Sequence, residues 1–268
     1  MTIKEKDFIM KKNYSIRKTV MATGALFTIV LFTSCLKTND NNDPDTPVAG
    51  LMAFHLSPDK PSIGIALSGN NLTSTALDYI NYTGGYLGIH PGTRSVAAYD
   101  AGTGVSFTGS DFTFNEGDYY SLFVVGAENE YRNVIVNDPL DSLTASAGKA
   151  YIRYINAIPD PEKPLVTISD NNGNVISEQA AFAFVSDFVE VDAGTAELAI
   201  SNNGNIQASR SVTLEERKVY TVLFAGIPGS EDTAKSIQIR YIENGTLSED
   251  AAAQQGISFR SPHQSTIN

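Results

Sequence analysis

The sequence is short of cysteine, tryptophan and histidine, with one, none and three of them in 268 residues. A single cysteine excludes an intramolecular disulfide, so apolar cores must supply the stability of the fold. The lack of tryptophan removes the residue that most often stacks on sugars, although Tyr and Phe can take that role. His55, His90 and His263 are too scattered for a metal site, and we expect neither a metal nor another cofactor.

Basic residues are also scarce, since 19 Lys and Arg stand against 30 Asp and Glu and give a net charge of -11. Residues 1–34 hold six of the basic residues and two of the acidic ones, so the rest of the chain is more acidic still. An anionic protein of this kind repels phosphate backbones and anionic headgroups. This excludes nucleic-acid binding and electrostatic attachment to a membrane.

Apolar runs long enough to span a membrane as a helix are lacking too. The longest run, Val20 to Phe32, is broken by polar residues and falls short of the roughly 20 residues that a bilayer requires. It follows a basic stretch and precedes two small residues, the order found in signal peptides. We therefore predict that residues 1–34 are a signal peptide, with translation starting at either Met1 or Met10.

The segment from Leu31 to Cys35 resembles the lipobox of bacterial lipoproteins, in the loose form of the Bacteroidota. The resemblance implies that the Cys35 thiol is acylated, with palmitate as a fatty acid, and that Cys35 begins a lipid-anchored outer-membrane protein. Residues 35–48 are polar and rich in Asn and Asp, which predicts a flexible acidic tether. An ordinary linker and a surface-export signal fit this tether equally, so both the periplasmic and the cell-surface side stay open.

The body of the chain is an internal duplication, in which residues 50–137 match residues 150–243. Each copy begins with a strand that runs into a proline turn. Later matches include glycines and tyrosines at corresponding places. The matched pairs are Met52 with Ile152, Phe54 with Tyr154, Pro58 with Pro159, Asp59 with Asp160, Gly92 with Gly194, Tyr120 with Tyr220, and Gly126 with Gly226.

Apolar and polar residues alternate through both copies, as at Phe112 and Phe114, which is the spacing of β-strands. We predict about seven short strands in each copy and an all-β fold of two tandem immunoglobulin-like antiparallel β-sandwich domains. The predicted parts are a first sandwich at 49–138, a linker at 139–148, a second sandwich at 149–245 and a polar tail at 246–268.

Four segments of the second copy carry a family pattern: Pro159 and Asp160, Phe184 to Val191, Ala193 to Thr195, and Val219 to Gly226. Together they resemble the domain-of-unknown-function family numbered 4397, found in exported bacterial proteins. The first copy follows the same pattern more loosely. The resemblance implies a β-sandwich module of envelope proteins, and it brings no catalytic residues to transfer.

Tyrosines are the candidate contact residues. Tyr79, Tyr82 and Tyr86 are neighbours in the first copy, and an exposed strip of them would stack on a sugar or a protein partner. Turned inward, they would fill a core instead. Tyr120 and Tyr220 each begin an apolar strand after a polar turn, where β-sandwiches place a tyrosine whose hydroxyl ties the corner.

Two short segments, residues 141–143 and 232–234, resemble the acceptor sequence for O-glycosylation in Bacteroidota envelope proteins. The resemblance implies glycans on Ser142 and Thr233.

Motifs for catalysis are missing, including the GxSxG elbow, glycine-rich phosphate loops and zinc-hydrolase patterns. Asp59 and Asp160 recur in the two copies, but carboxylates of separate domains do not flank one glycosidic bond, and turn residues need no further role. We predict a non-enzymatic binding or scaffold module for a protein or polysaccharide partner. A glycan-active hydrolase and a purely architectural spacer are the alternatives, and the oligomeric state stays open.

Overall fold

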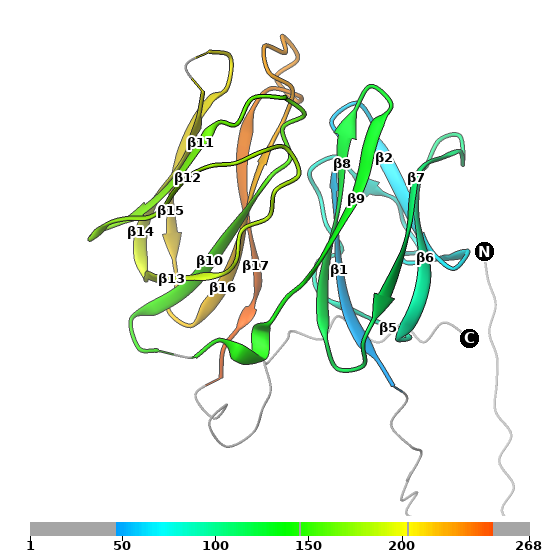
Figure 1. Ribbon diagram of the computed structural model, residues 1–268, viewed down its shortest axis with the longest axis horizontal. Coiled ribbons are helices and arrows are strands. Elements are labelled where there is room, and N and C mark those ends of the chain that lie inside the picture. The colour runs from blue at the N-terminus through cyan, green and yellow to red at the C-terminus, as the bar shows by residue number, and fades with distance from the viewer. Residues whose placement is uncertain (1–46, 145, 203, 249–268) are drawn as a thin grey trace, which may run out of the picture. The chain divides into compact units, whose positions relative to one another are not determined.

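The structure is a computed structural model that describes residues 47–144, 146–202 and 204–248 (Figure 1). These residues belong to one compact unit of the chain. The predicted signal peptide, Cys35, nearly all of the tether and the tail beyond Ser248 lie outside the described residues.

The described chain is all-β and forms two β-sandwiches, one for each copy, as predicted. We term them repeat 1, residues 49–138, and repeat 2, residues 149–246. The strands of repeat 1 are β1 (Ala49–Leu56), β2 (Ser62–Leu67), β3 (Asn70–Asn71), β4 (Leu77–Asp78), β5 (Leu87–Ile89), β6 (Gly92–Asp100), β7 (Ser106–Phe114), β8 (Tyr119–Ala127) and β9 (Glu130–Asn137). A short 3-10 helix, η1 (Leu140–Ser142), precedes repeat 2, whose strands are β10 (Lys149–Asn156), β11 (Leu165–Asp170), β12 (Gly173–Gln179), β13 (Val189–Asp192), β14 (Gly194–Ser201), β15 (Gln207–Leu214), β16 (Lys218–Ala225) and β17 (Gln238–Thr246).

The two repeats have the same sheet topology. In each repeat we term the sheet that faces the other repeat the inner sheet, and the remaining one the outer sheet. Repeat 1 has an inner sheet of order β5-β1-β8-β9 and an outer sheet of order β3-β2-β6-β7, with β4 paired to β2. Repeat 2 has an inner sheet of order β13-β10-β16-β17 and an outer sheet of order β12-β11-β14-β15. Neighbouring strands are antiparallel except for β1 with β8 and β10 with β16, which are parallel. The alternation of residues did not reveal these parallel pairs, because it does not indicate which strands lie side by side.

Each repeat has its own apolar core between its two sheets. In the outer strand β14, buried and accessible residues alternate, because one face meets this core and the other faces outward. The inner strands β8 and β16 are instead buried along nearly their whole length. Their second face is covered as well, since the two inner sheets pack on each other.

The structure corrects the sequence match at the first strands. In the β1–β8 pair Leu51 lies opposite Tyr120, and in the β10–β16 pair Ile152 lies opposite Tyr220. Leu51, and not Met52, is therefore the equivalent of Ile152. Because side chains alternate between the faces of a strand, this one-residue difference moves Met52 from the core of repeat 1 to the face toward repeat 2.

Two tyrosines tie the corners of the sandwiches, as predicted. The Tyr120 hydroxyl accepts a hydrogen bond of 3.0 Å from the backbone N–H of Asn115, and the Tyr220 hydroxyl accepts one of 3.0 Å from that of Glu215. Burial raises the pKa of Tyr220 to about 12. Both hydroxyls thus satisfy a backbone donor that would otherwise be left without a partner at a turn.

Candidate functional site

The interface between the two inner sheets brings together buried side chains from distant parts of the chain (Figure 1). Phe54 of β1 stacks on Phe123 of β8, with ring centres 4.7 Å apart, and both rings face repeat 2. Apolar residues on β10 and β16 meet them. Apart from Ile80, the buried residues of this interface cluster are Met52, Phe54, Leu56, Phe123 and Val125 from repeat 1, and Ile155, Ala157, Leu223 and Ala225 from repeat 2.

A single arginine, Arg153 of β10, is buried beside the interface cluster, with its side chain 2% exposed. Its Nη1 donates to Oδ1 of Asp138 at 2.6 Å, and the Asp138 side chain is fully buried. Nη2 donates to Ser121 at 2.8 Å and Nε donates to Thr221 at 3.0 Å. The centre of the Phe188 ring lies 4.2 Å from the guanidinium carbon of Arg153. A buried charge requires a counter-charge and hydrogen bonds, and Arg153 has both.

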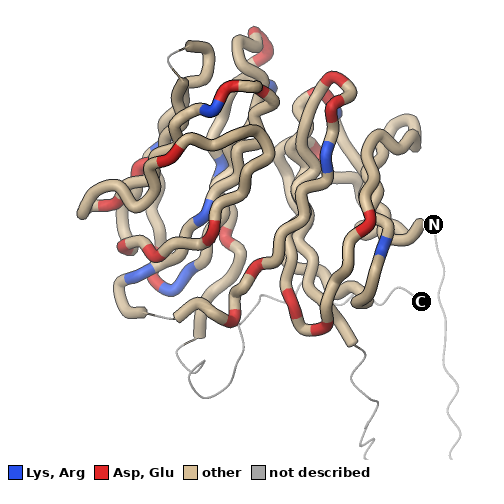
Figure 2. Tube along the Cα trace, in the orientation of Figure 1, with Lys and Arg blue, Asp and Glu red and all other residues tan. Residues whose placement is uncertain are grey.

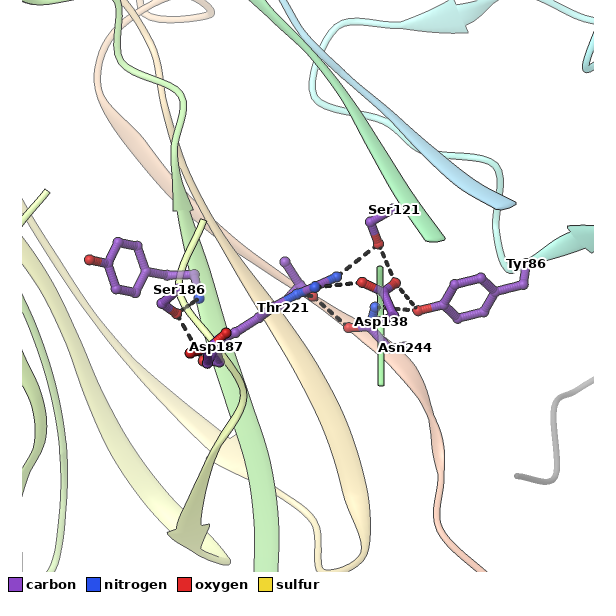
Figure 3. A network of polar contacts seen from close by, with 9 residues as sticks. Tyr86, Ser121, Asp138, Ser186, Asp187, Thr221 and Asn244 are labelled. Carbon is purple, nitrogen blue, oxygen red and sulfur yellow. Dashed lines mark hydrogen bonds and ion pairs between the residues drawn. The ribbon is translucent and has the colours of Figure 1, made fainter. Parts of the chain in front are cut away.

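Two further residues close the network (Figure 3). Thr221 donates to Oδ1 of Asn244 at 2.7 Å, and Nδ2 of Asn244 lies 3.2 Å from the Tyr86 hydroxyl. That hydroxyl donates to Oδ2 of Asp138 at 2.5 Å, where Ser121 also donates at 2.7 Å. Burial and the Asp138 charge raise the pKa of Tyr86 well above its ordinary value, so Tyr86 stays a donor. We term these residues, together with Arg153, the Arg153 network. It joins β8, the residue after β9 and the residue before β5 to β10, β16 and β17.

A groove of about 580 Å³ opens where loops of the two repeats meet. The β8–β9 hairpin forms one wall, and repeat 2 forms the other with the loops around Pro159, Phe182 and Ile227. Arg132 of β9 lies over the ring of Phe182, with 5.2 Å from its guanidinium carbon to the ring centre. The carboxylates that line the groove belong to Glu128, Glu130 and Asp160. Figure 2 shows acidic residues at several of the turns at this end. An aromatic ring, one cation and several carboxylates can recognise a polar ligand.

The structure corrects the prediction of an exposed tyrosine strip. Tyr79, Tyr82 and Tyr86 are partly buried and pack against the interface cluster. Tyr82 stacks on Phe54 with ring centres 5.6 Å apart, and Tyr79 meets the ring of His55 edge-on at 5.8 Å. Tyr86 belongs to the Arg153 network. The position of a residue in a loop does not indicate which way its side chain turns. Here the rings pack against the apolar face between the repeats, because burial removes their apolar surface from water.

The predicted glycosylation residues are both exposed. Ser142 ends η1, where its hydroxyl donates to the Pro139 carbonyl at 2.6 Å. Thr233 lies in the loop between β16 and β17. An enzyme can reach either residue, and glycosylation stays a prediction, as does acylation of Cys35.

Hydrogen bonds within each repeat account for the recurring aspartates. Oδ2 of Asp59 accepts from the Tyr131 hydroxyl at 2.5 Å and from the Glu128 N–H at 3.0 Å. Oδ1 of Asp160 accepts from the Glu162 N–H at 2.8 Å. Asp59 thus joins the turn after β1 to the β8–β9 hairpin, whereas Asp160 holds its own turn. In the part of the chain that the structure describes, no three His, Cys, Asp or Glu side chains group as metal ligands. Nor does any helix within those residues have the length and apolarity to cross a bilayer.

Sequence reasoning missed the Arg153 network, although one signal was present. Arg153 is the only charge in the otherwise apolar run from Ala150 to Ile155, within a strand buried on both faces. Such an arginine needs a counter-ion. The sequence did not indicate that Asp138, in what was predicted as the junction with the linker, supplies it.

Comparison with known proteins gives one family. The model of the family described as "Domain of unknown function (DUF4397)" matches residues 49–163 and again residues 150–266. No curated protein matches the chain. The two matches fall on the two sandwiches and together cover most of the sequence, so the chain belongs to the DUF4397 family and carries two copies of its domain.

Proposed function

We propose that this protein is a lipid-anchored protein of the bacterial outer membrane that works without catalysis, as a binding or scaffold module for a protein or polysaccharide partner. Cys35 would carry the anchor, and the acidic residues 35–48 would give the two repeats reach. The support for this part is the order of basic, apolar and small residues before the only cysteine.

The observation that carries the binding role is the groove between the repeats. It is lined from both sides, by the β8–β9 hairpin and by the loops of repeat 2, and it offers Phe182 and Arg132 beside carboxylates. Aromatic and arginine side chains dominate the energetics of most protein interfaces, and aromatic rings also stack on sugars. The deeper polar groups, in the Arg153 network, are engaged with one another and so serve the contact between the repeats.

The anchor is tested by fractionating cells that express the native protein or its Cys35→Ala variant, followed by protease treatment of intact cells. We expect the native protein in the outer membrane and the variant in the soluble fraction. Digestion of the native protein would place it on the cell surface, and protection would place it in the periplasm. A variant that stays in the membrane would contradict the lipoprotein proposal.

The binding role is tested by placing a photo-crosslinking amino acid at Phe182 in living cells. Val105, an exposed hydrophobic residue that does not line this groove, is the matched control position. We expect an adduct from position 182 and none from 105, as a single band for a protein and a ladder for a polysaccharide. The absence of any adduct from position 182 would contradict binding at the groove and favour the architectural spacer.

A further inference from the structure

The two repeats present the same face to each other. Because Leu51 is the equivalent of Ile152, the next residues along the two strands correspond in order, which makes Met52 the equivalent of Arg153 and Phe54 the equivalent of Ile155. An independent observation agrees, since Phe54 forms an isolated β-bridge with Tyr82, and Ile155 forms the same kind of bridge with Val185.

The equivalence extends over the interface cluster. The equivalent pairs in the cluster are Phe54 with Ile155, Leu56 with Ala157, Phe123 with Leu223, Val125 with Ala225, and Tyr82 with Val185. Each member of a pair therefore packs toward the other repeat from the same place on its own inner sheet. A contact in which both sides use the same patch is the isologous kind found in two-fold homodimers.

Equivalent residues of the two repeats also form the polar part of the interface. Ser121 and Thr221 are equivalent, and they donate at 2.7 Å to Asp138 and to Asn244. These two acceptors are equivalent as well, since each follows the residue that pairs with the corner tyrosine of its repeat, Asn137 and Glu243. Two differences break the symmetry. Repeat 2 has Arg153 where repeat 1 has Met52, and repeat 1 has Asp138 where repeat 2 has Asn244. The cation and the anion of the only buried ion pair among the described residues thus come from opposite repeats.

We propose that the inner-sheet face of each repeat is a self-complementary docking surface, and that Arg153 with Asp138 restricts its partner to the other repeat. Two copies of repeat 1 paired through this face would bury two Asp138 carboxylates without a cation. Two copies of repeat 2 would bury two Arg153 guanidinium groups without an anion. An unpaired buried charge is strongly unfavourable, so the ion pair selects the pairing of unlike repeats by penalising the two like pairings.

The test uses residues 36–268, which contain the whole compact unit, with a protease site inserted among residues 144–147 between the repeats. After cleavage of the folded chain, native mass spectrometry should show the two fragments held together one to one. The cleaved mixture is then unfolded in urea and refolded, so that each fragment can associate with a like or an unlike fragment. We expect pairs of unlike fragments alone, whereas a face without selectivity would give about half of the pairs as like fragments.

A double variant, Arg153→Met with Asp138→Asn, removes both charges and gives the two faces the same residues at these two polar positions, Met with Met52 and Asn with Asn244. We expect its refolded fragments to include pairs of like repeats. The control is Lys235→Met with Asp232→Asn, which removes an exposed ion pair of 3.6 Å and should leave the pairing as in the native chain.

Two results would overturn the proposal. Native fragments that separate after cleavage would show that the face does not dock without the linker. Native fragments that pair at random would show that the ion pair does not select the partner. Because both results come from the native sequence, the proposal is tested even if the double variant fails to refold.

Discussion

Replacing Arg153 with methionine should destabilise the protein by about 3 kcal/mol, because the Asp138 carboxylate then stays buried without its cation. Removal of one partner from a buried ion pair costs about 3 to 5 kcal/mol in other proteins. The lower end applies here, since Asp138 keeps two donors, Tyr86 and Ser121, after the substitution. Thr221 keeps its bond to Asn244 and is not left without a partner.

The companion variant carries Asp138→Asn as well as Arg153→Met, and it should recover most of the lost stability. It removes both charges, and an apolar replacement of a buried ion pair is often neutral. Methionine is also the residue at the equivalent position of repeat 1, Met52, which packs in the same interface cluster. We expect the double variant to lie within about 1 kcal/mol of the native protein.

Urea unfolding followed by circular dichroism measures these differences, with tyrosine fluorescence as a second probe. Lys235→Met, which removes one member of an exposed ion pair, serves as the control and should change stability by less than about 1 kcal/mol. A loss below about 1 kcal/mol for Arg153→Met would refute the reasoning. So would a double variant as unstable as the single one, since it would mean that the unpaired charge is not the cause.

Three other perturbations have defined outcomes. Burial lowers the pKa of His55 from 6.5 to about 4, so the unfolded chain binds the proton at a higher pH than the folded chain does. The free energy of unfolding should therefore fall by about 3 kcal/mol as the pH drops from 6.5 to 4. His55→Asn should flatten this fall, as measured by urea titrations at each pH. Tyr220→Phe, which deletes the corner hydroxyl, should cost about 1 kcal/mol in the same assay, whereas no loss would contradict the corner's role. Gly226→Ala should cost about 3 kcal/mol and lower the midpoint of thermal unfolding. Gly226 has φ of 126°, and a Cβ there would lie 2.4 Å from the Ser236 carbonyl oxygen. An unchanged midpoint would contradict this strain.

Strand spacing and internal duplication predicted most of the architecture. Alternation at positions such as Phe112 and Phe114 depends only on local geometry, since a strand turns successive side chains to opposite faces. The corner tyrosines were also predictable, because a polar turn followed by an apolar strand places Tyr120 and Tyr220 beside a backbone donor a few residues away. These features concern contacts within a short stretch of chain.

The contact between the repeats was not predictable from the same patterns. Met52 was matched with Ile152, and a shift of one residue hid its equivalence to Arg153. The sequence left open whether Tyr79, Tyr82 and Tyr86 turn outward or inward, and in the structure they are partly buried against the interface cluster. The register of a strand and the direction of loop side chains depend on which surface packs against them, and the sequence alone does not show which surface that is.

The linear order of residues was enough to predict two all-β copies and their corners, and to suggest a signal peptide and a lipid anchor, because each of these depends on local pattern. Folding in three dimensions brought Arg153 to Asp138, turned the tyrosines inward and formed the groove between the repeats. Those features arise where two sheets distant in sequence bury their faces together. The burial of apolar area drives that contact, while its polar partners become neighbours only once it has formed.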